Sequence, residues 1–308
     1  MNLKDYGLTP TFPPVLDATM VKDFMFCPSY FYLRRVLGLV KKKYDLIEDA
    51  GRDWGSMWHK LLETYNGSIA NGMSVAEATD AALVHLSPWP NSLVGETDRH
   101  GRTQMRMAEI FFNYIETFGV QDLKVYTPVA AEHFFDTFDE EFGIRWAGRI
   151  DRVVRKGQKI ILWDYKTTAW MTKYYFEQHE FSFQIPGYVR AVAGMLTEPV
   201  NDVIVDVLYT LKNKHEFFRR SIPISPQRLT EWGTNVRNIL NYMYYLRDNH
   251  LEEPEAWVKN WNHCTMWNRA CTFADIHWID PQPTTRLRIL AEDYIVDRWD
   301  PSREAEEE

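Results

Sequence analysis

The sequence predicts an α/β protein in which helices come first and a sheet follows. Apolar residues recur at helical spacing through most of the first 120 residues. Three strand-like segments then follow in close succession, and after them helices and strands alternate. The chain has 308 residues, 45% of them hydrophobic, enough for one large elaborated domain or for a core with a helical subdomain.

Four helices are expected in the first 120 residues. The first begins at a capping residue at 17–19 and runs to about Val36, and the second begins near Asp53. Helical spacing continues at residues 75–86 and 102–118, with a proline-rich break between these two segments.

The strands are bounded by turn residues. We expect an antiparallel meander of three strands, then a helix, a pair of strands and a last helix. In order, these segments are strands at 125–138, 142–154 and 159–166, a helix at 175–196, strands at 202–211 and 215–222, and a helix at 226–248. Lys156-Gly157 forms the turn of the hairpin that joins the second and third strands.

This hairpin carries ionisable groups on otherwise apolar strands. Asp151 lies on one strand, and Asp164 and Lys166 lie on the next. A carboxylate in a buried strand costs several kcal/mol unless it is paired or bound to a metal. The hairpin therefore predicts a metal site with a lysine beside it.

The spacing of these residues has a chemical reason. Side chains alternate along a strand, so Asp164 and Lys166 point to one face while Tyr165 points to the other. Two carboxylates suit Mg²⁺ or Mn²⁺, and the ammonium of Lys166 can orient the attacking water or neutralise charge that develops on phosphorus. The alternative is a surface hairpin with an ordinary Asp/Lys pair.

In this hairpin and in four other segments the chain resembles the PD-(D/E)XK nuclease superfamily. The similarity is to its RecB-like branch, which includes helicase-linked nuclease domains, CRISPR adaptation nucleases and phage exonucleases, and it spans about residues 17 to 280. The other segments are Cys27-Pro28 with Gly38-Leu39, Gly55 with His59, Gln184 with Tyr188, and Cys264 with Cys271. The resemblance implies a restriction-endonuclease-like core, a mixed central sheet flanked by helices, with an N-terminal helical subdomain and a C-terminal metal-cluster staple.

The resemblance also implies roles for residues on two helices and on one strand. His59 lies at helical spacing from Gly55 and Glu63 and would be a third metal ligand, although a lone helical histidine is more often structural. The Tyr165 carbonyl would complete the metal shell. Gln184 and Tyr188, one helical turn apart, would line the active site, unless they are simply exposed polar residues.

The three cysteines suggest a second centre. They are few and far apart, which argues against a disulfide framework. By resemblance, Cys27, Cys264 and Cys271 would hold a [4Fe-4S] cluster, with His277 in place of a fourth thiolate. The same donors suit Zn²⁺, His263 is a rival ligand, and three incidental free cysteines are the remaining alternative.

The function expected from these features is that of a metal-dependent DNA nuclease. An exonuclease acting on single-stranded DNA or duplex ends in recombination, repair or phage DNA metabolism fits best, with a recombination or replication protein as a possible partner. A catalytically silent DNA-binding subunit and an RNA- or nucleotide-directed hydrolase are the alternatives. The expected organisation is a helical region at 1–120, a nuclease core at 121–250 and a cluster segment with an acidic tail at 251–308.

Composition fits a cytosolic globular protein, and the resemblance implies the cytoplasm of a bacterial or phage-infected host cell. The sequence contains neither a run of 18 apolar residues nor a signal peptide, so we expect neither a membrane span nor export. The net charge of −8 is unfavourable for DNA binding, but local patches govern such binding more than the total charge does. Basic clusters occur at Arg34, Arg35 and Lys41–Lys43, at Arg102 and Arg106, and at Lys212, Lys214, Arg219 and Arg220. We interpret the first as a DNA backbone contact and the others as solvated faces.

Twelve tryptophans are many for this length. Four of them bracket the predicted site and are either core residues or platforms for stacking single-stranded bases: Trp54, Trp58, Trp163 and Trp170.

Overall fold

The computed structural model describes residues 6–42, 50–90, 93, 101–266, 269–278 and 283–298. The chain forms two compact units, each assembled from separate stretches of sequence. Unit 1 contains residues 1–44, 136–148 and 230–308, and unit 2 contains residues 45–135 and 149–229. The organisation expected from the sequence, with segments at 1–120, 121–250 and 251–308, remains a prediction.

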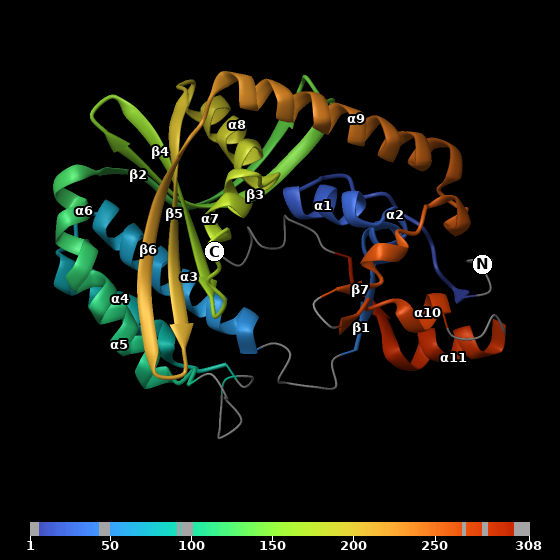
Figure 1. Cartoon of the computed structure of the whole chain (residues 1–308), viewed down its shortest axis with the longest axis horizontal. Helices are drawn as coiled ribbons and strands as arrows, with labels where there is room; N and C mark the ends of the chain where they lie inside the picture. The colour runs from blue at the N-terminus through green and yellow to red at the C-terminus, as the bar shows by residue number, and fades with distance from the viewer. Residues whose placement is uncertain are drawn as a thin grey trace. The chain divides into compact units, whose positions relative to one another are not determined.

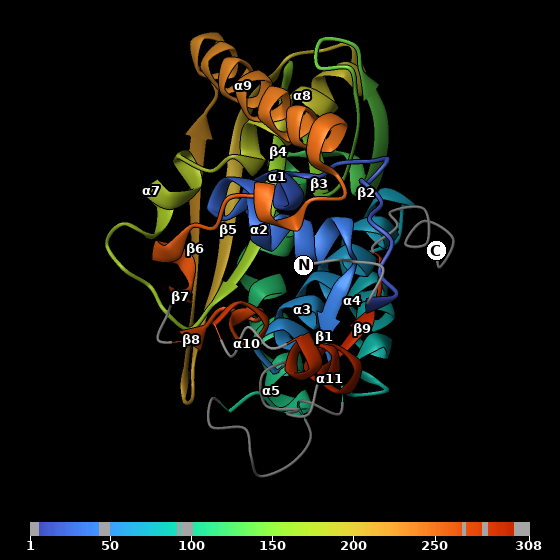
Figure 2. The same cartoon turned by 90° about the vertical axis from the view of Figure 1, so that its right-hand side faces the viewer.

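The helical layer of unit 2 consists of α3 (Ala50–Ala70), α4 (Val75–Leu83), α5 (Gln104–Tyr114) and α6 (Val120–Val125). Ser74 and Glu77 form a capping box at the start of α4, and the Thr103 hydroxyl caps α5. One face of α3 is buried, with Trp54, Trp58 and Leu61 each at most 2% exposed. In both views α4 and α5 lie beside α3 (Figures 1 and 2).

The sheet has five strands in the order β2-β3-β4-β5-β6. Their bounds are β2 (Thr127–Asp139), β3 (Ile144–Lys156), β4 (Lys159–Thr168), β5 (Val200–Leu211) and β6 (Lys214–Pro223). β3 and β4 pair antiparallel across the predicted turn, where Gly157 adopts φ +59°, a left-handed conformation that favours glycine. β4 and β5 pair parallel, and β5 and β6 pair antiparallel, so the sheet is mixed as expected.

One face of this sheet packs against the helices. Trp163 and Tyr165 of β4 and Leu208 of β5 belong to one buried cluster with apolar residues of α3, α4 and α5. β4 is buried over most of its length, which explains why its sequence is a nearly continuous apolar run.

The helix expected at 175–196 is instead two helices, so this prediction was wrong. α7 (Tyr175–Glu180) and α8 (Gln184–Leu196) are separated by three residues. The Ser182 hydroxyl accepts a hydrogen bond from the Gln184 backbone N–H at 3.1 Å, at the start of α8. The crossover between the parallel strands β4 and β5 thus consists of two helices (Figure 1).

Unit 1 begins with α1 (Ala18–Phe26), capped by Asp17, whose carboxylate accepts from the Met20 N–H at 2.6 Å. The expected helix to Val36 is interrupted at Cys27, because Pro28 starts a new helix, α2 (Pro28–Phe31), which continues as a π-helical turn. β1 (Leu39–Lys41) pairs with β9 (Tyr294–Val296), as Figure 2 shows. The other elements are α9 (Pro226–His250, from residue 230 onward), β7 (Thr265–Met266), β8 (Arg269–Ala270), α10 (Ala274–Trp278) and α11 (Pro283–Asp293).

None of the described helices combines the length and apolar character that a membrane crossing requires.

Candidate active site

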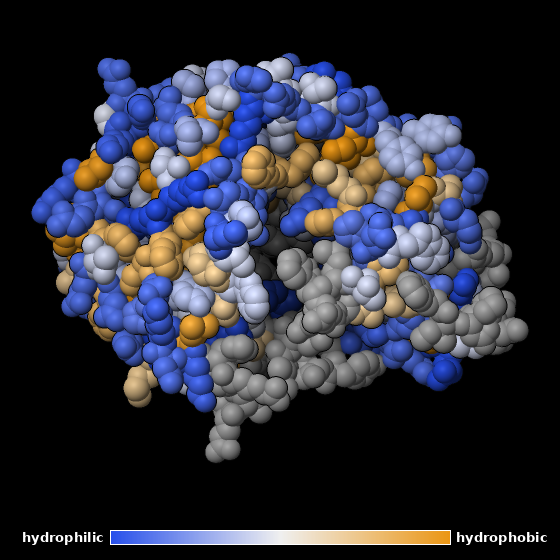
Figure 3. Space-filling view, viewed as in Figure 1, coloured by the Kyte–Doolittle hydropathy of each residue, from blue (hydrophilic) through white to orange (hydrophobic). Residues whose placement is uncertain are grey.

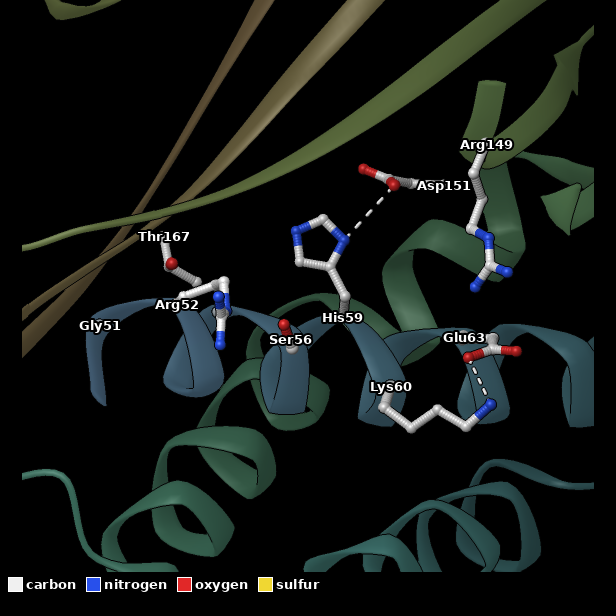
Figure 4. Close-up of a pocket in the computed structure, with 10 residues that line it drawn as sticks. Gly51, Arg52, Ser56, His59, Lys60, Glu63, Arg149, Asp151 and Thr167 are labelled. Carbon is white, nitrogen blue, oxygen red and sulfur yellow. Dashed lines mark ion pairs between the residues drawn. The ribbon is translucent and has the colours of Figure 1, made fainter. Parts of the chain in front are cut away.

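Helix α3 and strands β3 and β4 bring His59, Asp151, Asp164 and Lys166 together in unit 2. Arg152 pairs with Trp163 in the β3–β4 ladder, so Asp151 and Asp164 follow at the same level of neighbouring strands. His59 points from α3 toward Asp151, as Figure 4 shows. The hairpin therefore presents its carboxylates to the histidine-bearing helix.

Asp151 is held from two sides. Its Oδ2 accepts a hydrogen bond from the Tyr165 backbone N–H at 2.7 Å, and its Oδ1 lies 3.4 Å from His59 Nδ1. Burial by itself would raise the pKa of Asp151, but the charges of His59 and Lys166 outweigh it and hold the pKa below its usual value. Burial likewise favours neutral His59, and Asp151 reverses this effect, so the pKa of His59 is raised. Each member of the pair therefore stabilises the charged form of the other.

Asp164 and Lys166 form a largely buried ion pair. Lys166 Nζ lies 2.7 Å from Asp164 Oδ1, as the predicted alternation requires. Asp164 is only 4% exposed, and its second oxygen, Oδ2, is buried without a hydrogen-bond partner among the described residues. Burial, and then Asp151, raise the pKa of Asp164 against the opposing charge of Lys166. The reading of this pair as an ordinary surface pair is wrong, because a surface carboxylate would be solvated.

A cavity of about 460 Å³ opens beside these residues (Figure 4). Gly55, His59 and Glu63 of α3 all line it, as their helical spacing predicts. A β-carbon on Gly55 would lie 3.0 Å from Thr167 Oγ1, closer than most real contacts, so the glycine permits the close approach of α3 to β4.

Two arginines of this cavity were not singled out from the sequence. Arg52 of α3 and Arg149 of β3 line it together with His59 and Asp151. A signal for Arg149 was present, because strand alternation places it on the same face as Asp151. Guanidinium groups suit the bidentate recognition of phosphate.

Residues 16–305 match the family model of the PD-(D/E)XK nuclease superfamily. The chain belongs to this superfamily.

Relatives of this superfamily member are distant. The chain is 27% identical over 182 residues to the uncharacterized protein RT0391 of Rickettsia typhi, and 36% identical over 58 residues to the uncharacterized protein RC0550 of Rickettsia conorii. These matches cover 55% and 19% of this chain but only 20% and 7% of the relatives, so the chain spans a small part of their length. A solved structure from Eubacterium rectale described as "Putative exonuclease" covers 87% of this chain and 94% of its own, with 13% identity and a TM-score of 0.44.

On the face of β4 opposite Asp164 and Lys166, Tyr165 makes hydrogen bonds to residues of α3 and β3. The Tyr165 side chain, 2% exposed, accepts hydrogen bonds from Asn66 Nδ2 at 3.2 Å and Arg152 Nη1 at 3.5 Å. Asn66 lies on the same helix as His59, so its bond ties α3 to the strand whose backbone N–H holds Asp151. These side chains position the site rather than take part in chemistry.

The α8 pair expected near the site lies on one helix face. Gln184 Nε2 donates to the Tyr188 hydroxyl at 2.7 Å. Burial raises the pKa of Tyr188 to about 12, with Asp164 raising this pKa further and Lys166 opposing it. Ile185 of the same helix is 2% exposed, whereas Phe181, which precedes the helix, is 85% exposed.

The cysteines gather in unit 1. Cys27, Cys264, Cys271 and His277, with the rival His263, line one cavity of about 350 Å³. Cys27 Sγ accepts from the Asn260 backbone N–H at 3.4 Å, and His277 Nε2 lies 3.3 Å from Ser29 Oγ. Burial lowers the pKa of His277 to about 4, so its imidazole is neutral at physiological pH.

As placed, the described side chains include no group of three or more His, Cys, Asp or Glu residues arranged to hold a metal ion. This is true of the candidate active site in unit 2 and of the cysteine cavity in unit 1. In unit 2, His59 and Lys166 engage the two carboxylates, and in unit 1 the donors near the thiols make hydrogen bonds. The donor types nevertheless suit a metal: oxygens and an imidazole at the first site, thiols and an imidazole at the second.

The tryptophans divide into two groups. Trp54, Trp58 and Trp163 are at most 2% exposed and belong to the core, which confirms the interpretation as core residues for these three. Trp170 is 78% exposed.

Of the first basic cluster, Arg35 and Lys41 form ion pairs within unit 1, to Asp23 at 2.7 Å and Asp275 at 2.6 Å. Lys43 and the acidic tail lie outside the described residues. Arg219 was expected on a solvated face, but its side chain is only 17% exposed and pairs with Asp122 and Asp206.

Proposed function

We propose that this member of the PD-(D/E)XK superfamily is a divalent-metal-dependent DNA exonuclease that acts in recombination, repair or phage DNA metabolism. The observation that carries this proposal is the convergence of His59, Asp151, Asp164 and Lys166. His59 and Asp151 line one cavity and lie 3.4 Å apart, Asp164 lies level with Asp151 on the neighbouring strand, and Lys166 pairs with Asp164. Membership of a nuclease superfamily supports phosphodiester hydrolysis as the chemistry.

The residues of this site suit Mg²⁺ or Mn²⁺. Asp151 and Asp164 supply hard carboxylate oxygens, including the buried Asp164 Oδ2 that has no hydrogen-bond partner among the described residues. His59 and the Tyr165 carbonyl would complete the set. When bound, the ion would supply positive charge that polarises the scissile phosphate.

The other residues would bind and orient the reactants. Lys166, held as an ammonium against Asp164, would donate a hydrogen bond to the attacking water or to the oxygen on which negative charge develops. Arg52 and Arg149 would contact non-bridging phosphate oxygens from the wall of the cavity. Gln184 and Tyr188 would line the site from α8.

A side-by-side assay tests this function. Linear single-stranded DNA, linear duplex, closed circular DNA and RNA of matched length are incubated with Mg²⁺, Mn²⁺ or EDTA. We expect linear DNA to be shortened only with a cation, and circular DNA to survive, because an exonuclease needs an end. Binding to DNA without cleavage would favour the silent subunit, preferential loss of RNA would favour the RNA-directed hydrolase, and cleavage of circles would favour an endonuclease.

We also propose a metal centre at Cys27, Cys264, Cys271 and His277, with [4Fe-4S] favoured over Zn²⁺. The shared cavity of about 350 Å³ supports this proposal, because donors far apart in sequence meet there. A centre that closes so long a loop would stabilise unit 1 by restricting the unfolded chain.

Metal analysis of anaerobically purified protein checks this centre. Brown protein with about four irons is the expected result, and colourless protein with about one zinc would indicate the alternative. Loss of the metal from Cys271→Ser, with His250→Gln as a control histidine outside the cavity, would assign the site. Metal-free, stably folded wild-type protein would overturn the proposal.

A further inference from the structure

The segment that links β4 to α8 exposes three large aromatic side chains. Trp170, Tyr174 and Phe181 are 78%, 63% and 85% exposed, whereas the other tryptophans that flank the site are buried. An apolar ring left in water forgoes the free energy of burial, so three such rings within twelve residues mark a surface that binds something. On the face shown in Figure 3, hydrophobic residues form separate patches among hydrophilic ones.

This segment has a fixed backbone at both ends. The Trp170 N–H donates to Thr168 Oγ1 at 3.0 Å, and this hydroxyl donates back to the Trp170 carbonyl at 3.1 Å. Between the exposed rings Tyr175 is buried, 9% exposed, and anchors α7. The rings are therefore presented from an ordered scaffold, which lowers the entropy cost of binding.

One lysine beside the rings is available to an anionic ligand. Lys173 Nζ lies 4.7 Å from the centre of the Tyr174 ring, and no described carboxylate is within ion-pair distance of it. The two glutamates of α7, Glu177 and Glu180, are both paired with Arg220, at 3.3 and 3.0 Å. The two glutamates share this single arginine, and Lys173 and Arg220 together balance their charge, so the exposed rings lie in a segment with one available lysine and no net negative charge.

The rings flank the candidate active site along the chain. Trp170 follows Lys166 by four residues, which is at most about 14 Å of extended chain. Phe181 precedes Gln184 by three residues. The backbone of Trp170 therefore lies within reach of a single strand bound at Lys166.

We propose that Trp170, Tyr174 and Phe181 form an aromatic platform that stacks the unpaired bases of single-stranded DNA next to the catalytic site. This inference rests on the proposed nuclease function and names its substrate as a single strand, because the faces of paired bases are covered by their neighbours in a duplex. Stacking on aromatic rings is tolerant of sequence, since every base has a π face.

Equilibrium binding in EDTA tests the platform without cleavage. Fluorescence anisotropy of labelled oligo-dT and of a duplex of equal length is measured for the wild-type protein, Trp170→Ala, Phe181→Ala and the double variant. We expect each single variant to bind the single strand roughly 5- to 100-fold more weakly, with duplex affinity nearly unchanged. The exposed rings Trp261 and Phe138, 64% and 66% exposed, provide the matched controls Trp261→Ala and Phe138→Ala, which should bind like wild type.

Unchanged single-strand affinity of the double variant, or an equal loss for the duplex, would overturn the platform. Because these rings are exposed, thermal unfolding of the variants should match that of the wild type and shows whether they fold. The binding assay also separates this inference from the nuclease proposal. Ring-dependent binding without cleavage in Mg²⁺ would support the platform and refute the nuclease proposal. Cleavage without ring-dependent binding would support the nuclease proposal and refute the platform.

Discussion

Replacing Lys166 by alanine is expected to lower the rate of DNA cleavage by roughly 10²–10³-fold, the loss typical when one preorganised donor to a developing charge is removed. The ammonium lies 2.7 Å from Asp164 and is the cation nearest the carboxylate pair in the described site. Asp164→Asn should cause a loss of at least the same order, because it removes a negative charge that would hold the cation. Single-turnover cleavage of a labelled oligonucleotide in Mg²⁺ measures both.

A second lysine of β4 supplies the matched control. Lys159 has a largely exposed side chain and lies 3.9 Å from Asp202. Lys159→Ala should therefore cleave at the wild-type rate. Thermal unfolding of each variant, measured under the assay conditions, shows that lost activity is not lost fold. Wild-type cleavage by Lys166→Ala would refute the assigned mechanism.

Replacing Arg219 by methionine is expected to lower the free energy of unfolding by about 3–5 kcal/mol, the cost of leaving a buried charge uncompensated. Its Nε lies 2.7 Å from Asp206 Oδ2 and its Nη1 lies 2.8 Å from Asp122 Oδ1. Asp206 is only 2% exposed, and burial raises its pKa even though Arg219 opposes this. The guanidinium also lies 3.6 Å from the centre of the Phe118 ring, so the variant loses packing as well as charge.

The next residue along β6 is the control for this variant. Arg220 is 41% exposed and pairs with two partly exposed glutamates, an arrangement worth about 0–1 kcal/mol. Equilibrium unfolding in urea should therefore show a much smaller loss for Arg220→Met than for Arg219→Met. Equal losses would mean that the buried network of Arg219 contributes no more than a surface ion pair.

Several parts of the site could be predicted because they depend on local geometry. Alternation along β4 put Asp164 and Lys166 on one face and Tyr165 on the other, and the structure has this arrangement. Helical spacing put Gly55, His59 and Glu63 on one side of α3, where all three line the cavity. Both periodicities follow from the covalent geometry of a strand or a helix and need no knowledge of distant residues.

Other features depended on contacts that no local pattern encodes. Trp163 and Trp170 are seven residues apart and equally aromatic, yet one is 0% and the other 78% exposed. Arg219 and Arg220 are adjacent and identical, yet only Arg219 meets Asp122 and Asp206. The break between α7 and α8 likewise lies within an otherwise helical apolar pattern.

The sequence by itself determined the order of the elements, the hairpin and the residues that face one another along a single strand or helix, because these follow from periods of two and of 3.6 residues. Only the tertiary structure decided which faces are buried, which cations are paired and that Arg52 and Arg149 share the cavity of His59 and Asp151. The physical reason is that burial and pairing are set by elements distant in sequence, such as α3 packing on β4, and burial decides whether a ring is core or platform and whether a charge is catalytic, structural or merely solvated.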